Sequence, residues 1–484
     1  MAMIDGPDFP EDGSPLEWID WTSRMQAAAS DPSGTAWVSA NAGSGKTHVL
    51  TQRVIRLMLA GSRPSSILCL TYTKAAASEM ANRVFERLAD WSTMPDERLA
   101  AEIERLEGKP PSRQILSEAR RLFARALETP GGLKIQTIHA FSEALLHQFP
   151  LEANVAGHFQ VLDDVGAAGL LSEARRSLLT ASASEGDSSL ASAFGHILGI
   201  ADDTGLERLI GEIIANRNKI QPFLQRAARQ GGIDTCLRSA YGLADDATIT
   251  GTEAACWPLP GFEGAAFLDY MENASRMGGS TIQSTVSRLA LASEEADLSR
   301  RMELLRDVFF TNNGTPRAQG SFTTAAMRKA DPALMDGIVA AQAHLAILFE
   351  RHARLEMMEA TQSALILAKR LIGDYEDLKR QRSLLDFEDL IERAAVLLRK
   401  ADIGPWIHYK LDQGIDHILV DEAQDTSPVQ WQIIKSLSED FFSGQSARQA
   451  LRTFFAVGDE KQSIYSFQGA RPERFAEERN ATRK

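Results

Sequence analysis

Residues Ser39–Leu50 read SANAGSGKTHVL, a loop of small residues that ends in Gly-Lys-Thr. Phosphate-binding loops have a small first residue, four variable positions and then Gly-Lys-Ser/Thr. Here the first position is Ala40, where such loops usually have Gly, and the last three are Gly45, Lys46 and Thr47. Small residues let successive backbone N–H groups turn inward on a phosphate, and a helix that follows adds the positive end of its dipole.

The residues on either side of the loop decide between a phosphate site and a glycine-rich turn that binds nothing. TAWVSA (35–40) is strand-like, and the apolar run after the loop is compatible with a helix. This context favours a nucleotide site in which Lys46 reaches the β- and γ-phosphates and Thr47 places its hydroxyl on Mg²⁺. The loop residues predicted to bind ATP are Ala40, Asn41, Ala42, Gly43, Ser44, Gly45, Lys46 and Thr47.

The segment VDEAQD (420–425) supplies acidic groups that a phosphate-binding loop lacks. An acid at a strand end can hold Mg²⁺, and we assign this role to Asp421. Its neighbour Glu422 is placed to orient or deprotonate an attacking water. Gln424 and Asp425 extend the polar edge and are candidates to couple the site to another part of the protein. The alternative is a strand that is simply capped by solvated acids.

A second unusual segment, VGDEKQSIYSFQGA (457–470), combines a neutral amide with two aromatic residues. Gln462 is a group that can sense a γ-phosphate. Tyr465 and Phe467 are two positions apart, so on an extended segment both side chains point the same way. Paired aromatics beside a nucleotide site suit base stacking, which is worth ~1–3 kcal/mol per base. The alternative is that both rings belong to the core.

The order of apolar runs predicts an α/β fold with a parallel sheet. Strand-like runs occur at SSILCLTYT (65–73), KIQTIHAF (134–141), HILVDE (417–422) and RTFFAVGD (452–459), with helix-prone sequence between them. Alternating strands and helices predict parallel pairing, and ligands then bind at the carboxyl ends of the strands. We expect α/β segments and mostly helical insertions to alternate along the chain. The α/β segments are 1–91 (with 1–15 as a leader), 131–165 and 373–484, and the helical insertions are 92–130 and 166–372.

Composition limits the classes of partner. The chain has 484 residues and a net charge of −13. Its 3 cysteines are widely spaced, so neither a disulfide framework nor a zinc site is expected. The acidic balance counts against gripping duplex DNA through bulk charge, but it allows a local channel for a single strand. No apolar run approaches the ~20 residues of a membrane helix. The first residues lack the apolar stretch of a signal peptide. We therefore expect a cytoplasmic protein without membrane contact.

Seven segments in this order resemble motifs of the UvrD/Rep-like superfamily 1 DNA helicases, and within that family they are most similar to the AddA branch. They are RMQAAAS (24–30), SANAGSGKT (39–47), LTYTKAAASEM (70–80), TIHAFSEALL (137–146), LLDFEDLI (384–391), ILVDEAQDTSPVQW (418–431) and VGDEKQSIYSFQGA (457–470).

The resemblance implies roles that spacing alone does not. The fold would be a RecA-like domain, 1A, interrupted by helical 1B insertions. Gln26 would read the adenine, and Arg53 joins the ATP-binding residues. The catalytic residues would be Lys46, Asp421, Glu422 and Gln462, with Thr47 and Asp421 on Mg²⁺. The residues that would contact single-stranded DNA are Tyr72, Thr137, His139, Tyr465 and Phe467.

The same resemblance implies an activity and a partner. The family drives 3′→5′ translocation and unwinding with ATP and Mg²⁺. AddA-type proteins act on single-stranded DNA and duplex ends in double-strand break repair by recombination, together with a partner of the AddB type.

This chain ends at Lys484, just past the last motif. We therefore expect the second RecA-like domain and the nuclease domain to be absent, and activity to need the missing half. Two alternatives remain. One is a catalytically inactive fragment that binds ATP and single-stranded DNA and acts through a partner. The other is an unrelated P-loop ATPase.

Overall fold

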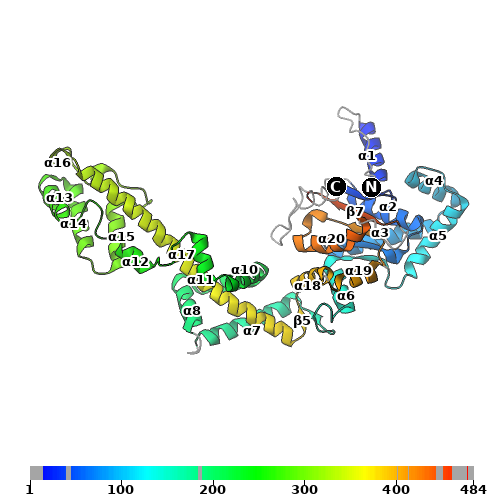
Figure 1. Cartoon of the computed structure of the whole chain (residues 1–484). Coiled ribbons are helices and arrows are strands. Elements are labelled where there is room, and N and C mark those ends of the chain that lie inside the picture. The colour runs from blue at the N-terminus through cyan, green and yellow to red at the C-terminus, as the bar shows by residue number, and fades with distance from the viewer. Residues whose placement is uncertain are drawn as a thin grey trace. The chain divides into compact units, whose positions relative to one another are not determined.

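The computed structural model describes most of the chain (Figure 1). The described residues are 15–39, 45–183, 188–400, 402–412, 414–442, 451–459 and 477. The chain divides into two compact units. The first unit is Met1–Ala167 with Gln381–Lys484, and the second is Ala168–Arg380.

The first unit is built on a parallel sheet. Its described residues form five strands in the order β1-β7-β6-β2-β3. The strands are β1 (Ala36–Ser39), β2 (Ile67–Thr71), β3 (Lys134–Thr137), β6 (His417–Val420) and β7 (Thr453–Gly458). The central strands β2, β6 and β7 are buried along their whole length, as expected when helices cover both faces. The predicted α/β fold class with a parallel sheet is confirmed.

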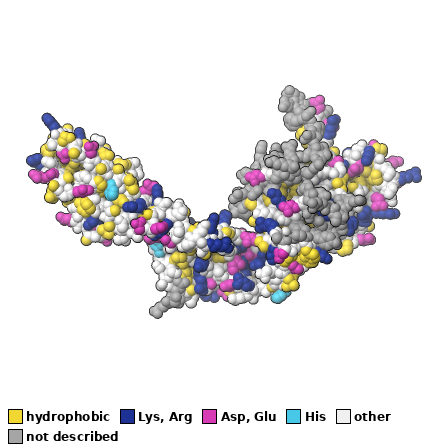
Figure 2. Space-filling model, in the orientation of Figure 1, with side chains coloured by type: hydrophobic (Ala, Val, Ile, Leu, Met, Phe, Trp, Pro, Cys, Tyr) yellow, Lys and Arg dark blue, Asp and Glu magenta, His cyan; other side chains and the backbone are white. Residues whose placement is uncertain are grey.

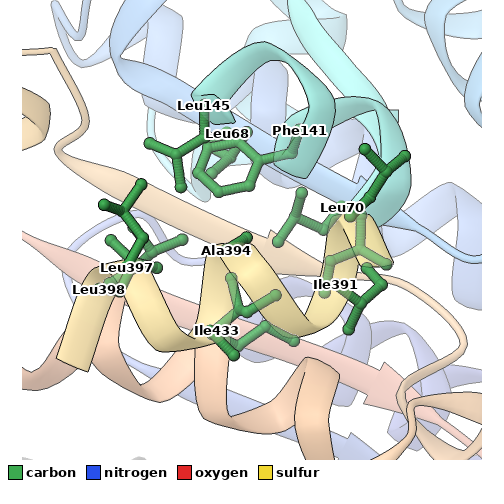
Figure 3. Close-up of a cluster of buried hydrophobic side chains, with 14 of the residues drawn as sticks. Leu68, Leu70, Phe141, Leu145, Ile391, Ala394, Leu397, Leu398 and Ile433 are labelled. Atoms are coloured by element: carbon green, nitrogen blue, oxygen red, sulfur yellow. The ribbon is translucent and has the colours of Figure 1, made fainter. Parts of the chain in front are cut away.

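One face of the sheet packs against three helices, α6 (Ile138–Gln148), α18 (Phe387–Arg399) and α20 (Pro428–Phe442). Successive side chains of a strand point to opposite faces, so Leu68 and Leu70 of β2 reach this core together. Figure 3 shows α6 and α18 meeting over the sheet, with α20 beside them. The residues labelled there are Leu68, Leu70, Phe141, Leu145, Ile391, Ala394, Leu397, Leu398 and Ile433.

The opposite face of the sheet buries the intervening strand residues, such as Cys69. The helices on this side are α2 (Lys46–Leu59), α3 (Lys74–Thr93), α4 (Asp96–Glu107) and α5 (Arg113–Leu127). Helices α4 and α5 come from the segment predicted as the first helical insertion, and they share one core with α2, α3 and the sheet.

A second, short sheet lies beside the points at which the chain leaves and re-enters the first unit. Strands β4 (Gln160–Val161) and β5 (Leu384–Leu385) pair in parallel. Asp386 then begins α18 with a capping box, in which its side chain and that of Asp389 each accept a hydrogen bond from the other's backbone N–H. Among the residues described in this unit, the remaining α-helices are α1 (Pro15–Ala29) and α19 (Gly404–Asp412).

The second unit is helical in its described part. The long helix α17 (Leu334–Gln381) has 48 residues. Its first half shares a core with the helices between Cys256 and Met327. The other helices are α7 (Asp164–Ser182), α8 (Ser188–Ile200), α9 (Asp203–Ala215), α10 (Arg217–Arg229), α11 (Ile233–Tyr241), α12 (Ile249–Ala254), α13 (Ala265–Met277), α14 (Ser280–Glu294), α15 (Leu298–Phe309) and α16 (Ala325–Ala330).

Helix α17 differs from the sequence-based expectation at its end. We placed the return to α/β structure at residue 373, but α17 continues through Gly373 to Gln381. A single helical glycine costs about 1 kcal/mol, and burial of neighbours such as Leu371, Ile372 and Tyr375 outweighs it.

Two further observations bear on cysteine chemistry and on membranes. The cysteines are free, with Cys69 and Cys256 buried and Cys236 half-buried. Within the described ranges, no helix combines the length and apolar character that crossing a membrane requires.

Candidate functional site

The predicted phosphate-binding loop joins the end of β1 to the start of α2. Strand β1 ends at Ser39, and α2 begins at Lys46, so the described ends of the loop lie at the carboxyl edge of the sheet. Gly45 precedes α2 with φ 83°, in the left-handed region where a Cβ is strained. A helix N-terminus at this edge suits an anion. Ala40–Ser44 lie outside the described residues, so their contacts with ATP stay predictions.

Gln26, on α1, lies beside this helix N-terminus. A Cβ built on Gly45 would be only 3.0 Å from Nε2 of Gln26. An amide in this place offers both a donor and an acceptor to a ligand held by the loop. Its contact with adenine stays a prediction, but the position is next to the predicted phosphate site.

Lys46 and Glu422 meet although 376 positions separate them in the chain. Nζ of Lys46 lies 3.4 Å from Oε2 of Glu422. The Lys46 side chain is 11% exposed and that of Glu422 is 39% exposed, so the pair opens to solvent on the acidic side. Strand β6, which ends just before Asp421, is separated from β1 by β7, and this strand order brings the loop and the acids to one edge.

Asp421 is the more buried of the two acids, at 8% exposure. Its N–H donates to the carbonyl of Leu70 at 2.9 Å, and its Oδ1 accepts from the N–H of Glu422 at 3.0 Å. Burial, followed by the charge of Glu422, raises the pKa of Asp421 to about 6, although Lys46 opposes the shift. A nearby divalent cation would favour the charged carboxylate.

The donor types at this edge fit Mg²⁺. Thr47 lies in the first turn of α2, and Asp421 directly follows β6. A hydroxyl and a carboxylate are hard oxygen donors, and Mg²⁺ in nucleotide sites takes one or two protein ligands together with phosphate oxygens. Among the residues that the structure describes, no group of three or more His, Cys, Asp or Glu forms a metal site.

Arg53, also predicted to bind ATP, is 0% exposed on α2. Its guanidinium donates to the carbonyls of Ala29 at 3.1 Å and Asp31 at 2.5 Å, and also to that of Gly34. Burial lowers the pKa of Arg53 to about 10. These contacts tie the connection between α1 and β1 to α2. They favour a role in holding α1, and with it Gln26, in place, while the direct contact with ATP stays a prediction.

Three residues predicted to contact DNA lie at the carboxyl ends of the neighbouring strands β2 and β3, whose last residues, Thr71 and Thr137, are in register. Tyr72 is half-buried. The Oγ1 of Thr137 accepts from the N–H of Ala140 at 3.1 Å and caps α6, which leaves its hydroxyl hydrogen to donate. His139 follows on α6, and burial lowers its pKa.

Phe387, which the sequence reasoning did not assign, lies next to His139. The two ring centroids are 5.7 Å apart in an edge-to-face arrangement, and Phe387 is 44% exposed. The signal was present in LLDFEDLI (384–391), where an aromatic residue follows the helix-capping Asp386. A large exposed ring at a helix start is a candidate surface for a flat ligand.

Besides Ala40–Ser44, three more predicted residues lie outside the described part of the chain. They are Gln462, Tyr465 and Phe467. Their roles at the γ-phosphate and on DNA stay predictions. The described edge brings together Gln26, Gly45, Lys46, Thr47, Asp421 and Glu422 at the β1 and β6 ends, and Tyr72, Thr137 and His139 at the β2 and β3 ends.

Comparison of the chain with known proteins identifies the family to which it belongs. A family model described as the UvrD/REP helicase N-terminal domain matches residues 21–482. Similar curated proteins are named as subunits of an ATP-dependent helicase/nuclease. The one from Desulforudis audaxviator is 30% identical over 501 residues, covering 96% of this chain and 37% of that protein. The one from Lactobacillus gasseri is 26% identical over 484 residues, covering 94% and 37%.

Another similar protein with this name, from Latilactobacillus sakei, is 25% identical over 536 residues, covering 99% of this chain and 52% of that protein. This chain thus spans between 37% and 52% of the length of these relatives. The matched range 21–482 includes the loop before α2, the acids Asp421 and Glu422 after β6, and Asp459 after β7. The chain therefore belongs to the UvrD/REP helicase N-terminal domain family.

Proposed function

We propose that this chain forms the ATP-binding part of a DNA helicase motor that translocates 3′→5′ and acts in double-strand break repair by recombination. Family membership and the names of its relatives support this. The observation that carries the proposal is the convergence of Lys46, Asp421 and Glu422 at the end of a parallel sheet, beside a helix N-terminus.

Each residue of this group has a role that its chemistry suits. Lys46 would bind the β- and γ-phosphates, and Thr47 and Asp421 would hold Mg²⁺, which neutralises phosphate charge when bound. Once Lys46 turns to a phosphate, Glu422 is released from the ion pair. It is then free to orient the attacking water and to accept its proton.

The DNA side of the proposal rests on the neighbouring strand ends. Tyr72, His139 and Phe387 lie beyond β2, β3 and β5 in the same unit. Stacking on such rings is worth ~1–3 kcal/mol per base and tolerates any sequence. The chain carries a net charge of −13, and Figure 2 shows acidic and basic side chains interspersed on its visible face. We therefore expect the chain to bind single-stranded DNA through a few local contacts, with an affinity that depends only weakly on salt concentration.

A second candidate is a fragment that binds ATP and single-stranded DNA but turns ATP over slowly unless a partner completes it. Lys46 is a described cation whose charge lowers the pKa of Asp421. An arginine supplied to the γ-phosphate is worth ~10³–10⁵ in rate in comparable NTPases. We propose that the full rate needs such an arginine from elsewhere, and that a protein of the AddB type is a further partner.

The domain names follow from the same proposal. The sheet-containing unit would be domain 1A, and the helical unit and the α4–α5 pair would be 1B insertions. The proposed site of action is the cytoplasm, where its DNA substrate would lie.

The testing experiment is steady-state ATP hydrolysis by the purified chain, with and without single-stranded DNA, together with equilibrium ATP binding. Lys46→Ala is the test variant, and Lys109→Ala, an exposed lysine in the α4–α5 loop, is the matched control. The proposal expects ATP binding that Lys46→Ala abolishes and Lys109→Ala retains. Equal binding by all three proteins would contradict it. Fast DNA-stimulated turnover by this chain alone would contradict the second candidate.

A further inference from the structure

Both the amide nitrogen and the amide oxygen of the Gln424 side chain make hydrogen bonds. Gln424 is 2% exposed, in the short 3₁₀ turn Ala423–Asp425 that follows β6. Its Nε2 donates to Oε2 of Glu422 at 2.6 Å and lies 3.3 Å from Oδ2 of Asp425. Its Oε1 accepts from the backbone N–H of Asp459 at 2.9 Å. The amide therefore bridges the carboxylate of Glu422 to the chain just after β7.

The Gln424 side chain connects β6 and β7 beyond the point where their backbone pairing ends. Strands β6 and β7 are paired up to Val420 and Ala456. Beyond that point β6 turns away at Glu422, whose φ of 49° lies in the left-handed region. The side chain of Gln424 restores a connection between the two carboxyl ends at Asp459.

Gly458 provides independent support for this close approach. A Cβ at this position would lie 2.6 Å from Oε1 of Gln424 and 3.2 Å from its backbone nitrogen. Gly458 is not one of the described glycines with a positive φ, so backbone strain does not account for it. The glycine is needed because the Gln424 amide occupies the space of its missing side chain.

The bridge is also the tighter of two contacts that hold Glu422. The carboxylate is 3.4 Å from Nζ of Lys46 on one side and 2.6 Å from Nε2 of Gln424 on the other. The two contacts come from different segments of the chain, so a Lys46 side chain that turned to a phosphate would leave the amide contact in place. An amide is required here because it donates at one end and accepts at the other, whereas a carboxylate would face Glu422 with a second negative charge.

We propose that Gln424 is a positioning residue that couples the end of β7 to the water-orienting carboxylate of Glu422. A displacement of the backbone at Gly458 and Asp459 moves the Gln424 amide, and the amide moves Glu422. Asp459 directly precedes residues 460–467, which contain the predicted γ-phosphate and DNA-contacting side chains. The inference rests on the proposed function, because Glu422 is given its catalytic role there.

The first test uses the full chain without nucleotide. The ¹³Cδ resonance of Glu422 is followed by NMR in glutamate-labelled protein and assigned by its loss in Glu422→Gln. We expect Gln424→Ala and Gly458→Ala each to shift this resonance. In the double variant, Gly458→Ala adds a much smaller shift, because its closest collision partner, Oε1 of Gln424, is gone and only backbone contacts remain. Gln342→Ala removes a glutamine that bridges two carbonyls in the other unit and serves as the control.

Gln424→Glu covers the case in which Gln424→Ala does not fold. It keeps the size and the acceptor but loses the N–H groups that hold Glu422. A Glu422 resonance that stays in place in Gly458→Ala or in Gln424→Glu would overturn the proposal. Additive shifts in the double variant would overturn it as well, since the two residues would then act separately.

The second test is steady-state hydrolysis of Mg-ATP with single-stranded DNA. Gln424→Glu and Gly458→Ala should lower kcat by about 10- to 100-fold, the value of a hydrogen bond to a charged group. KM for ATP should change by less than about threefold, because the Gln424 side chain is buried and contacts Glu422 and Asp459. A rise in KM with unchanged kcat would contradict positioning through Glu422.

The two proposals fail in different ways. ATP binding by the unaltered chain tests the proposed function and does not involve Gln424. The Glu422 resonance tests the bridge in the absence of nucleotide. A chain that binds no ATP but shows the coupled shifts would refute the function and leave the bridge intact.

Discussion

Nζ of Lys46 lies 3.4 Å from Oε2 of Glu422, which joins the first turn of α2 to the end of β6. Because the Glu422 side chain is 39% exposed, solvent screens the pair and its contribution to stability is about 0–1 kcal/mol. We expect Lys46→Ala to change the free energy of unfolding by less than about 1 kcal/mol while it abolishes ATP binding. Urea unfolding followed by circular dichroism checks this. A large loss of stability would mean that the ion pair is structural.

Gly45→Ala tests the turn into α2. An alanine at φ 83° costs about 1–2 kcal/mol, and its Cβ would also lie 3.0 Å from Nε2 of Gln26. Gly108, with φ 73° and open space around it, is the matched control for strain alone. We expect Gly45→Ala to weaken ATP binding about tenfold or more in isothermal titration, and Gly108→Ala to leave it unchanged. Equal effects of both variants would show that the site does not depend on this glycine.

Arg53→Ala tests whether the buried guanidinium serves structure or ATP. Its loss leaves three carbonyls, at Ala29, Asp31 and Gly34, without their donor. We expect the free energy of unfolding of the first unit to fall by about 3–5 kcal/mol, with faster amide exchange in residues 27–34. Arg121→Ala, at an exposed position of α5, should have little effect. Weaker ATP binding at unchanged stability would instead support direct contact of Arg53 with ATP.

His417 makes stability depend on pH. It is 3% exposed, with Nδ1 2.8 Å from Oγ1 of Thr453 and Nε2 2.9 Å from Oγ of Ser62. Burial lowers its pKa to about 4, against about 6.5 in the unfolded chain. Between these values the unfolded state binds a proton that the folded state does not. Stability is therefore full above pH ~6.5 and falls by at most about 1.4 kcal/mol per unit as pH drops towards 4.

The measurement is the free energy of unfolding between pH 4 and 7 for the wild type and His417→Gln. The difference between the two curves isolates the histidine, because all other titrating groups are shared. Parallel curves would show that His417 is not held neutral.

Phe387→Ala tests whether this exposed ring stacks on a base of single-stranded DNA. The ring is 44% exposed and contacts His139 edge to face. Loss of one stacked base should weaken binding of single-stranded DNA by about 1–3 kcal/mol without changing its salt dependence. Phe387→Trp should retain affinity, and Val396→Ala, which removes another exposed apolar side chain of α18, should not alter it. Fluorescence anisotropy at several salt concentrations checks this. A changed salt slope would indicate a phosphate contact instead.

Much of the fold was predictable because the strands of the first unit are short apolar runs with turn signals at their ends. Residues 67–71, 134–137, 417–420 and 453–458 fall inside the predicted runs. The end of α17 was not predictable from local pattern. Gly373 is a helix breaker by propensity, but the burial of Leu371 and Tyr375 depends on partners that the local sequence does not reveal.

The residues of the candidate site also separate into those that the sequence could identify and those that required the structure. Lys46, Thr47 and Asp421 could be named from the sequence because their motifs are local and their chemistry follows from residue type. Phe387 lies within a quoted motif but was not assigned a role, because its nearness to His139 depends on how α18 packs against α6. For Arg53, the contact with ATP stays a prediction, and only the structure revealed that its guanidinium is buried against the carbonyls of Ala29, Asp31 and Gly34.

By itself, the sequence determined the fold class and the family, because alternating apolar runs and motif spacing are local properties of the chain. Only the tertiary structure decided which distant residues touch. The strand order β1-β7-β6-β2-β3 sets Lys46 against Glu422 and aims the Gln424 amide at Asp459. The physical reason is that parallel strands bring the ends of distant segments to one edge, and the register and packing that fix those contacts come from the whole core.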